Sequence, residues 1–194
     1  GVFFVNLSRP QARWQLPTVA YHEAVPGHHF QIAIAQELRD VPTFRRVIPF
    51  TAYMEGWGLY AERLGYKLGL DADVYSVLGY KEAQLLRAVR LVVDTGIHSQ
   101  RWSRDQAIAY MTARLADTAE VRAEVDRYIV DPGQACAYMA GQLTLLQLRE
   151  RARRELGARF DIRRFHAVVL GNGAMPLTVL REQVDAYIAG AGRP

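Results

Sequence analysis

Apolar residues recur along most of this chain at the three- and four-residue spacing that is typical of α-helices. The strongest period covers residues 82–99, where one helix face would carry Leu85, Leu86, Val89, Val92 and Val93. Weaker versions of the same pattern predict helices over residues 18–38, 51–68, 71–80, 104–116, 118–130, 132–156, 163–170 and 176–188. The chain is therefore expected to fold mainly from helices.

Polar and turn-forming residues mark several ends of these predicted helices. Ser103 and Gln106 have the spacing of a capping box, in which each side chain binds a backbone amide at the start of a helix. Pro26-Gly27 interrupts the pattern between residues 18 and 38, since proline removes a backbone donor and glycine admits unusual dihedral angles. The other expected boundaries are N-caps at Thr18 and at Asp71, a start at Asp131-Pro132 and an end at Gly157.

One segment departs from the helical pattern. Residues 2–7, with the sequence VFFVNL, are rich in β-branched and aromatic side chains, and this composition favours a strand. The predicted fold class is therefore mainly α, a multi-helix structure with a short N-terminal strand.

The composition is that of a globular protein with one hydrophobic core. Hydrophobic residues make up 50% of the 194 positions and charged residues 23%, which excludes collagen-like and highly charged disordered classes. Cys136 is the only cysteine, so a disulfide framework is excluded. No apolar run approaches the roughly 20 residues that span a bilayer, and no membrane span is expected in this segment.

The net charge of +4 is a weak signal for nucleic-acid binding. Arginines are densest over residues 149–164, but they alternate there with Glu150, Glu155 and Asp161. This alternation is typical of a solvated helix face rather than of a track of phosphate contacts. We therefore expect no nucleic-acid partner.

The candidate chemistry is concentrated in the segment YHEAVPGHHFQ at residues 21–31, which holds three of the five histidines. In the zinc hydrolase motif H-E-x-x-H, two histidines bind Zn²⁺ and the glutamate acts as general base on water. His22, Glu23 and His28 supply the same residue types, with four residues rather than two between Glu23 and His28. The alternative is a histidine-rich helix start that binds no metal, but the combination of H-E with P-G-H-H favours a metal site.

The longer spacing requires a break in the helix. On an ideal helix His22 and His28 would point roughly 120° apart and could not share a metal. A bulge at Pro26-Gly27 would bring His28 to the face of His22. His29 is the rival ligand, because at i+7 it regains that face, but it would lie roughly 10 Å along the axis. We therefore prefer His28.

A zinc site with two histidines and an open position needs a third protein ligand. Glu55 and Glu62, in the segment MEGWGLYAE, are the best candidates, and their seven-residue spacing places them on one helix face. For either residue the alternative is an exposed helix carboxylate, which is the usual fate of glutamate.

Hydrolysis also requires a donor that stabilises the oxyanion formed at the carbonyl. The candidates are His98, Tyr128 and Tyr138, each of which could instead be a structural residue. Asp94 lies one helical turn before His98 and could bind it or orient a ligand histidine. Three arginines could bind a substrate carboxylate, although salt bridges are their default interpretation: Arg87, Arg90 and Arg127.

Four segments resemble the bacterial domain-of-unknown-function family 885 and occur in that family's order: HEAVPGHHFQ, TAYMEGWGLYAERLG, RAVRLVVDTGIHSQRWSRDQAIAYM and DPGQACAYMAGQLTLLQLRERA. The resemblance covers nearly the whole chain, from VFFVNL to FHAVVLGNGAMPL. The family's proteins are much longer. Residues 1–194 are therefore expected to form a single C-terminal catalytic, metal-binding portion, with the N-terminal part of the same protein as its partner.

The family is in turn similar to mainly helical zinc metallopeptidases, among them angiotensin-converting enzyme, thimet oligopeptidase and the thermostable carboxypeptidases. Those enzymes carry H-E-x-x-[G]-H, from which HEAVPGH departs by two inserted residues. The resemblance implies a zinc-metallopeptidase-like fold with a general base, Glu23, and three metal ligands: His22, His28 and Glu55. It also makes Tyr138 the closest match to the oxyanion donor, with His98 as the second candidate.

The function predicted from the sequence is a zinc-dependent hydrolase that cleaves a peptide or a small amide with metal-activated water. One alternative is a zinc hydrolase of a non-peptide amide, which differs only in its substrate. The other is a helical metal-binding or binding module without catalysis.

Overall fold

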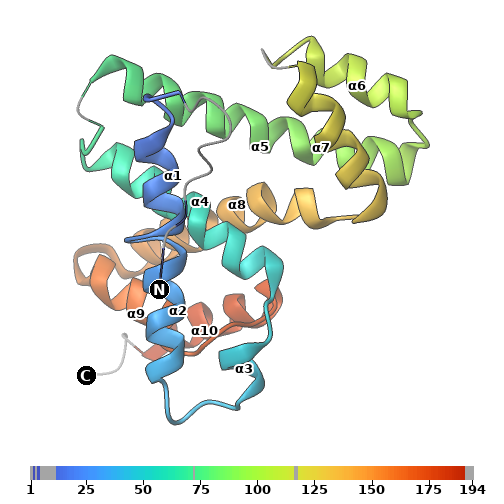
Figure 1. Ribbon diagram of the computed structural model, residues 1–194. Helices are drawn as coiled ribbons and strands as arrows, with labels where there is room; N and C mark the ends of the chain where they lie inside the picture. The colour runs from blue at the N-terminus through green and yellow to red at the C-terminus, as the bar shows by residue number, and fades with distance from the viewer. Residues whose placement is uncertain (1, 3, 5–11, 72, 116–117, 191–194) are drawn as a thin grey trace.

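The described part of the chain consists of α-helices joined by short loops, as Figure 1 shows. The computed structural model describes residues 2, 4, 12–71, 73–115 and 118–190. The helices are α1 (Leu16–Glu23), α2 (His28–Glu37), α3 (Phe44–Val47), α4 (Thr51–Lys67), α5 (Val74–Gln100), α6 (Arg104–Thr112), α7 (Thr118–Val130), α8 (Gln134–Leu156), a 3₁₀ turn η1 (Gly157–Arg159), α9 (Ile162–Leu170) and α10 (Leu177–Gly190). The predicted mainly α fold class is confirmed.

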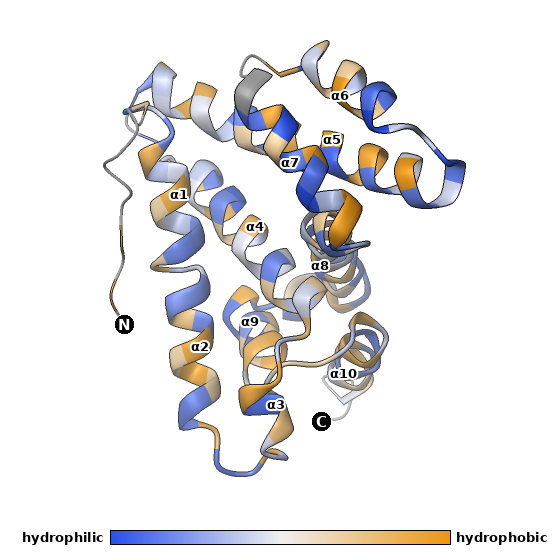
Figure 2. Cartoon of the chain, turned by 45° about the vertical axis from the view of Figure 1, so that its right-hand side comes forward, coloured by the Kyte–Doolittle hydropathy of each residue, from blue (hydrophilic) through white to orange (hydrophobic). Residues whose placement is uncertain are grey.

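Three long helices, α4, α5 and α8, form the centre of the molecule. The most extensive contact between described helices joins α4 to α8, and α8 also packs on α5. In Figure 1, α6 and α7 lie with α5 above α8, whereas α9 and α10 lie below it. Figure 2 shows α1 and α2 end to end along one side, where α1 contacts both α4 and α5.

The helices α4 and α8 approach each other closely because glycines face one another at their crossing. A Cβ atom at Gly141 would lie 2.0 Å from the carbonyl oxygen of Ala52 and 2.6 Å from Cα of Gly56. No side chain fits at either glycine without moving the backbone of the other helix. The crossing therefore fixes the position of Glu55, the residue before Gly56, relative to α8.

The buried apolar residues form two clusters that α8 connects. The first cluster lies between α4, α8, α9 and α10 and includes Trp57, Tyr60, Leu148 and Phe165. The second lies between α5, α6, α7 and the start of α8 and includes Val93, Met111, Val125 and Ala135. Tyr138 follows Ala135 by one helical turn, so it lies on the part of α8 between the two clusters.

Two predicted N-caps are wrong. Asp73 rather than Asp71 caps α5, and its carboxylate accepts hydrogen bonds from two backbone amides of the first turn. The predicted helices over residues 71–80 and 82–99 form this one helix, because no helix-breaking residue separates them. Thr18 does not cap α1, because the helix already begins at Leu16, with Pro17 in its first turn. Thr18 lies inside the helix and is 2% exposed.

Other predicted boundaries are confirmed. Ser103 and Gln106 form the expected capping box at the start of α6. Helix α8 ends at Leu156, and Gly157 follows with φ of 55°, a left-handed value that favours glycine. At its other end, however, α8 begins at Gln134 with Gly133 as its N-cap, so the expected start at Asp131-Pro132 lies two residues too early.

The expected N-terminal strand is not supported. Of residues 2–7 the structure describes only Val2 and Phe4, neither of which is in a strand, and the rest lie outside the described residues. Among the described residues, no helix combines the length and the apolar character that crossing a membrane requires.

Candidate metal centre

Three of the residues that the sequence suggests as metal ligands lie together at the junction of α1, α2 and α4. The potential ligand atoms of His22, His28 and Glu55 all lie within 4.8 Å of one another. Nε2 of His22 and Nε2 of His28 each lie 3.3 Å from Oε2 of Glu55. Two atoms bonded to a tetrahedral zinc at about 2.0–2.1 Å would be about 3.3–3.4 Å apart. The two histidine–glutamate separations therefore fit a shared zinc ion.

The break between α1 and α2 brings the two histidines to one site. His22 is in the last turn of α1 and His28 is the first residue of α2, and residues 24–27 between them are not helical. The two imidazole rings meet edge to face with centroids 4.6 Å apart. The predicted bulge is thus a full interruption of the helix, which reorients His28 by changing the direction of the chain.

Contacts to the backbone hold this interruption in place. The indole Nε1 of Trp57, on α4, donates a hydrogen bond of 2.8 Å to the carbonyl oxygen of Pro26. A Cβ atom at Gly27 would lie 1.9 Å from the carbonyl oxygen of His22, so only glycine fits there. Helix α4 therefore positions the loop as well as supplying Glu55.

Glu62, the rival to Glu55 as third ligand, binds the far side of His22. Its Oε1 lies 2.7 Å from Nδ1 of His22, and the residue is 1% exposed. Gln84 Nε2 donates to the other carboxylate oxygen at 3.3 Å, and an Arg87 Nη2 lies 3.6 Å from Oε1. The carboxylate accepts the Nδ1 proton of His22, so that Nε2 is the nitrogen that binds a metal once it gives up its own proton.

Burial and hydrogen bonding shift the pKa values of two residues at the centre. Burial lowers the pKa of His22, but its hydrogen bonds with Glu55 and Glu62 outweigh this effect and raise that pKa to about 9. Burial likewise raises the pKa of Glu55, while hydrogen bonds from His22 and His28 bring it down to about 2. Glu55 is therefore a carboxylate at neutral pH, the form that binds a cation.

A glycine on α4 makes room for the imidazole of His22. A Cβ atom at Gly58 would lie 2.6 Å from Cε1 and 2.7 Å from Nε2 of that ring. The glycine lies between Glu55 and Glu62, so the ring rests on bare helix backbone with a carboxylate on either side. The segment MEGWGLYAE thus shapes the centre as well as supplying its acids.

Glu23 and His29 flank the cluster and are both exposed. Glu23 is the last residue of α1, and no hydrogen bond or ion pair joins its side chain to another described residue. His29 is the second residue of α2 and is not among the clustered ligands. The chain direction after Gly27 brings His28, and not His29, to Glu55.

Tyr138 covers the centre from α8. Its ring is stacked on that of His22, with centroids 6.2 Å apart and an angle of 25° between the planes. Its hydroxyl accepts a hydrogen bond of 3.4 Å from Gln134 Nε2. Burial, and then the charge of Glu55, raise the pKa of Tyr138, so the hydroxyl keeps its proton at neutral pH.

The other oxyanion candidates make structural contacts. His98 is exposed near the end of α5, where its Nε2 lies 2.9 Å from the carbonyl oxygen of Tyr128. It follows Arg87, which borders the centre, by eleven residues, or roughly 16 Å along the helix. Asp94 accepts a hydrogen bond from the Gly133 amide rather than binding His98. No described contact joins His98, Tyr128 or Asp94 to the three clustered residues.

A charged network beside Tyr138 was not foreseen from the sequence. Glu124, on α7, binds two arginines: Arg90 Nη2 lies 2.7 Å and Arg127 Nη2 2.9 Å from its Oε2. The Tyr128 hydroxyl donates to the same oxygen at 2.7 Å. Arg90 and Arg127 are thus paired in the structure rather than free for a substrate. In the sequence, the only sign of this network is the i,i+3 and i,i+4 spacing of Arg127 and Tyr128 from Glu124 within α7.

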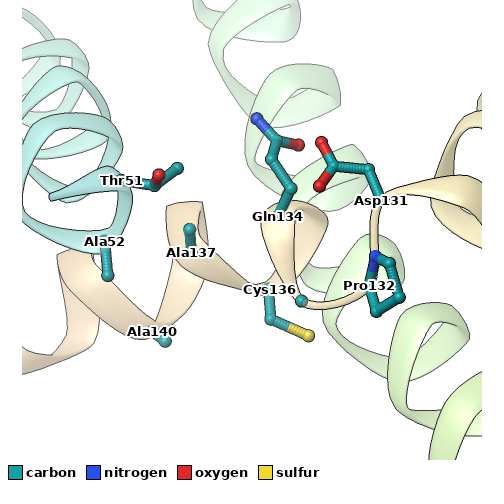
Figure 3. Close-up of a pocket in the computed structure, with 9 residues that line it drawn as sticks. Thr51, Ala52, Asp131, Pro132, Gln134, Cys136, Ala137 and Ala140 are labelled. Atoms are coloured by element: carbon teal, nitrogen blue, oxygen red, sulfur yellow. The ribbon is translucent and has the colours of Figure 1, made fainter. Parts of the chain in front are cut away.

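A cavity of about 540 Å³ opens between the first turns of α4 and α8 (Figure 3). Thr51 and Ala52 line it from α4, and Gln134 and Ala137 from α8. Thr51 precedes Glu55 by one helical turn, and Gln134 precedes Tyr138 by one turn and binds its hydroxyl. The cavity therefore lies one helical turn before Glu55 and Tyr138, neither of which lines it.

The solved structures that resemble this chain include two of proteins described as a "putative lipoprotein". A crystal structure from Colwellia psychrerythraea matches 92% of this chain with a TM-score of 0.88 and 47% sequence identity. A structure from Shewanella oneidensis, of unknown function, matches 88% with a TM-score of 0.80 and 27% identity. The chain spans 31% of the length of each of those chains.

No curated protein matches the sequence. The family model described as "Bacterial protein of unknown function (DUF885)" matches residues 1–184. On this match, the chain belongs to the DUF885 family of bacterial proteins.

Proposed function

We propose that this chain carries the metal centre of a zinc-dependent hydrolase that cleaves peptide or small amide bonds. The observation that supports it is the clustering of His22, His28 and Glu55 around one point. Two imidazoles and one carboxylate form the ligand set of known catalytic zinc sites, which keep a further position open. The buried Glu62 adds the partner that such sites provide for a ligand histidine.

The residues present fit zinc better than a harder cation. Calcium and magnesium are bound by oxygen atoms, whereas two of the three donors here are imidazole nitrogens. Zinc bound by these residues would supply Lewis acidity toward water and toward the substrate carbonyl. The remaining steps fall to the side chains around it.

Glu23 is the proposed general base. Its carboxylate accepts a proton from the attacking water and delivers that proton to the leaving amine. An exposed glutamate directly after His22, with no partner among the described residues, is free to exchange protons with a substrate. Tyr138 is the proposed hydrogen-bond donor to the oxyanion, since its ring stacks on that of His22 and its hydroxyl keeps its proton at neutral pH. His98 takes a structural role instead.

The proposal includes a similarity to helical zinc metallopeptidases and a substrate class, which is peptides or small amides. The chain is about a third as long as the solved relatives, so other parts of a protein of that length would supply further walls of the cleft. The N-terminal part of the same protein is the proposed partner. The cavity between the first turns of α4 and α8 is the proposed space for a substrate side chain.

Metal content tests the ligand set. The purified protein is expected to hold one zinc per chain, lost on treatment with a chelator. His22→Ala should abolish this binding, because it removes a ligand, whereas His29→Ala should retain it, because the exposed His29 is outside the cluster. Equal zinc content in the two variants, or none in the unmutated protein, would overturn the proposed centre.

Glu23→Gln separates a hydrolase from a metal-binding module without catalysis. The variant should keep its zinc and lose turnover of a peptide library by at least about 100-fold, since general base catalysis typically contributes 10²–10⁴-fold. Unchanged turnover would contradict the role of Glu23. Zinc binding without turnover of peptides or of simple amides in the unmutated protein would favour the non-catalytic module.

A further inference from the structure

We propose that Glu124, a residue of α7 with no described contact to the metal cluster, is a positioning residue that holds Tyr138 over His22. The inference rests on the proposed function, in which Tyr138 stabilises the oxyanion. The proposal adds α7 to the helices that form the site, because α7 contributes none of the residues considered as ligands or base.

Outside the metal cluster, Tyr138 contacts two arginines and a glutamine, of which Arg87 is the more distant arginine, with its guanidinium carbon 5.9 Å from the ring centroid. The guanidinium carbon of Arg90 lies 5.0 Å from the centroid of its ring, within the range of a cation–π interaction. Gln134 Nε2 donates to its hydroxyl at 3.4 Å. The arginines fix where the ring lies, and Gln134 fixes where its oxygen points.

The contacts of Tyr138 with Arg90 and Gln134 both lead back to Glu124, whereas Arg87 pairs with Glu62. Arg90 approaches the carboxylate through two nitrogens, Nε at 3.1 Å and Nη2 at 2.7 Å from Oε2. Arg127 binds the same carboxylate through Nε at 3.3 Å and Nη2 at 2.9 Å, and its Nη1 donates to Gln134 Oε1 at 2.5 Å. One carboxylate therefore anchors Arg90 directly and Gln134 through Arg127.

Glu124 carries its charge throughout the neutral range. Burial raises its pKa, but hydrogen bonds from Arg127 and the charge of Arg90 outweigh burial and lower the pKa to about 2. Charge-assisted bonds of this kind are stronger and more directional than neutral ones. Arg90 is 11% exposed at its side chain, so without the carboxylate its charge would be left largely buried and uncompensated.

The position of Tyr138 can be measured without any turnover. We would place 3-fluorotyrosine at position 138 and record its ¹⁹F resonance in the zinc-loaded protein with and without Glu124→Gln. Loss of the carboxylate frees Arg90 and Arg127, so the resonance should shift or broaden. Asp126→Asn is the matched control, since Asp126 lies on the same helix in an exposed pair with Arg104. An unchanged resonance in Glu124→Gln would overturn the proposal.

A double-mutant cycle tests whether Glu124 acts through Tyr138. Tyr138→Phe should lower kcat about 100-fold, as loss of an oxyanion donor does. Glu124→Gln should lower kcat about 10-fold with little change in KM, and it should cost nothing further in the Tyr138→Phe background. Additive losses, or a loss equal to that of Asp126→Asn, would contradict a positioning role.

A further variant guards against a simple folding defect. Gln134→Ala cuts the same chain of contacts at a half-buried residue, so it should move the ¹⁹F resonance even where Glu124→Gln unfolds the protein. If neither the unmutated protein nor any variant hydrolyses a substrate, the proposed function fails. The ¹⁹F comparison then decides the positioning role alone.

Discussion

His22 and Glu62 form a buried pair in which Nδ1 of the imidazole lies 2.7 Å from a carboxylate oxygen. The contact fixes the tautomer of His22 with Nε2 directed toward Glu55 and His28. Glu62 therefore contacts a proposed ligand from its far side and is not itself one of the proposed ligands.

Glu62→Gln should weaken zinc binding about 10- to 100-fold, as removing the partner of a ligand histidine commonly does. The amide keeps the shape of the side chain but removes the negative charge that polarises the imidazole. Competition with a chromophoric chelator measures the affinity. Glu37→Gln, on an exposed residue of α2, is the control, and equal affinities in the two variants would contradict the role of Glu62.

Gly58→Ala should displace the His22 ring, because the added methyl would lie 2.6 Å from its Cε1. We expect zinc affinity to fall at least about 10-fold, comparable to the loss of the partner of a ligand histidine. Stability need not fall, since alanine gains about 1 kcal/mol of helix propensity over glycine. Gly190→Ala, where a Cβ would meet no atom within 4 Å, should leave zinc affinity unchanged. Wild-type affinity in Gly58→Ala would show that the ring is not confined by α4.

Gly141→Ala should destabilise the crossing of α4 and α8. Its Cβ would lie 2.0 Å from the Ala52 carbonyl oxygen, so the helices must separate. Overpacking of this kind costs about 2–3 kcal/mol in the free energy of unfolding, which urea denaturation measures. Leu143→Ala, on an exposed side chain of the same helix, should cost much less. An unfolding midpoint shared by the two variants would contradict this account of the crossing.

His166 should make stability depend on pH. Burial, and then the charge of Arg149, lower its pKa from the usual 6.5 to about 4, and its Nε2 lies 2.8 Å from the Tyr60 hydroxyl. The unfolded chain therefore takes up a proton at a higher pH than the folded protein does. The stability due to neutral His166 is complete above pH 6.5 and is lost as the pH falls toward 4.

The size of this effect is about 1–2 kcal/mol once the partial solvation of the ring is allowed for. Urea unfolding at pH 7 and at pH 4.5 measures it, with His166→Gln as the comparison. Because glutamine does not titrate, the variant should lose less stability between the two pH values. Equal losses would show that other groups produce the acid sensitivity.

The helices could be predicted from the sequence more readily than their first residues. The period of apolar residues located α8 because its buried residues from Gln142 to Leu156 recur every three or four positions, whereas α4 is buried on all sides from Gly56 to Glu62. The cap of α5 was misplaced because Asp71 and Asp73 are chemically equivalent in the sequence, and only the direction of the chain decides which one meets the free amides.

The candidate site could likewise be predicted only in part from the sequence. The residue types and spacing around His22 and His28 suggested the cluster, since few other arrangements use that local pattern. Glu55 and Glu62 share a helix face, so the pattern alone could not tell which one meets Nε2 and which one meets Nδ1 of His22. The link between Arg90 and Glu124 joins residues 34 positions apart, and no local pattern indicates such a contact.

The bare stretch of α4 under the His22 ring also constrains how relatives can diverge. With a side chain at position 58 the imidazole cannot occupy its place, and without the imidazole a glycine there only weakens the helix. Positions 22 and 58, distant in sequence, should therefore behave as one inherited unit. Lineages that retain the histidine are expected to retain the glycine, and those that abandon the histidine are free to replace it with alanine.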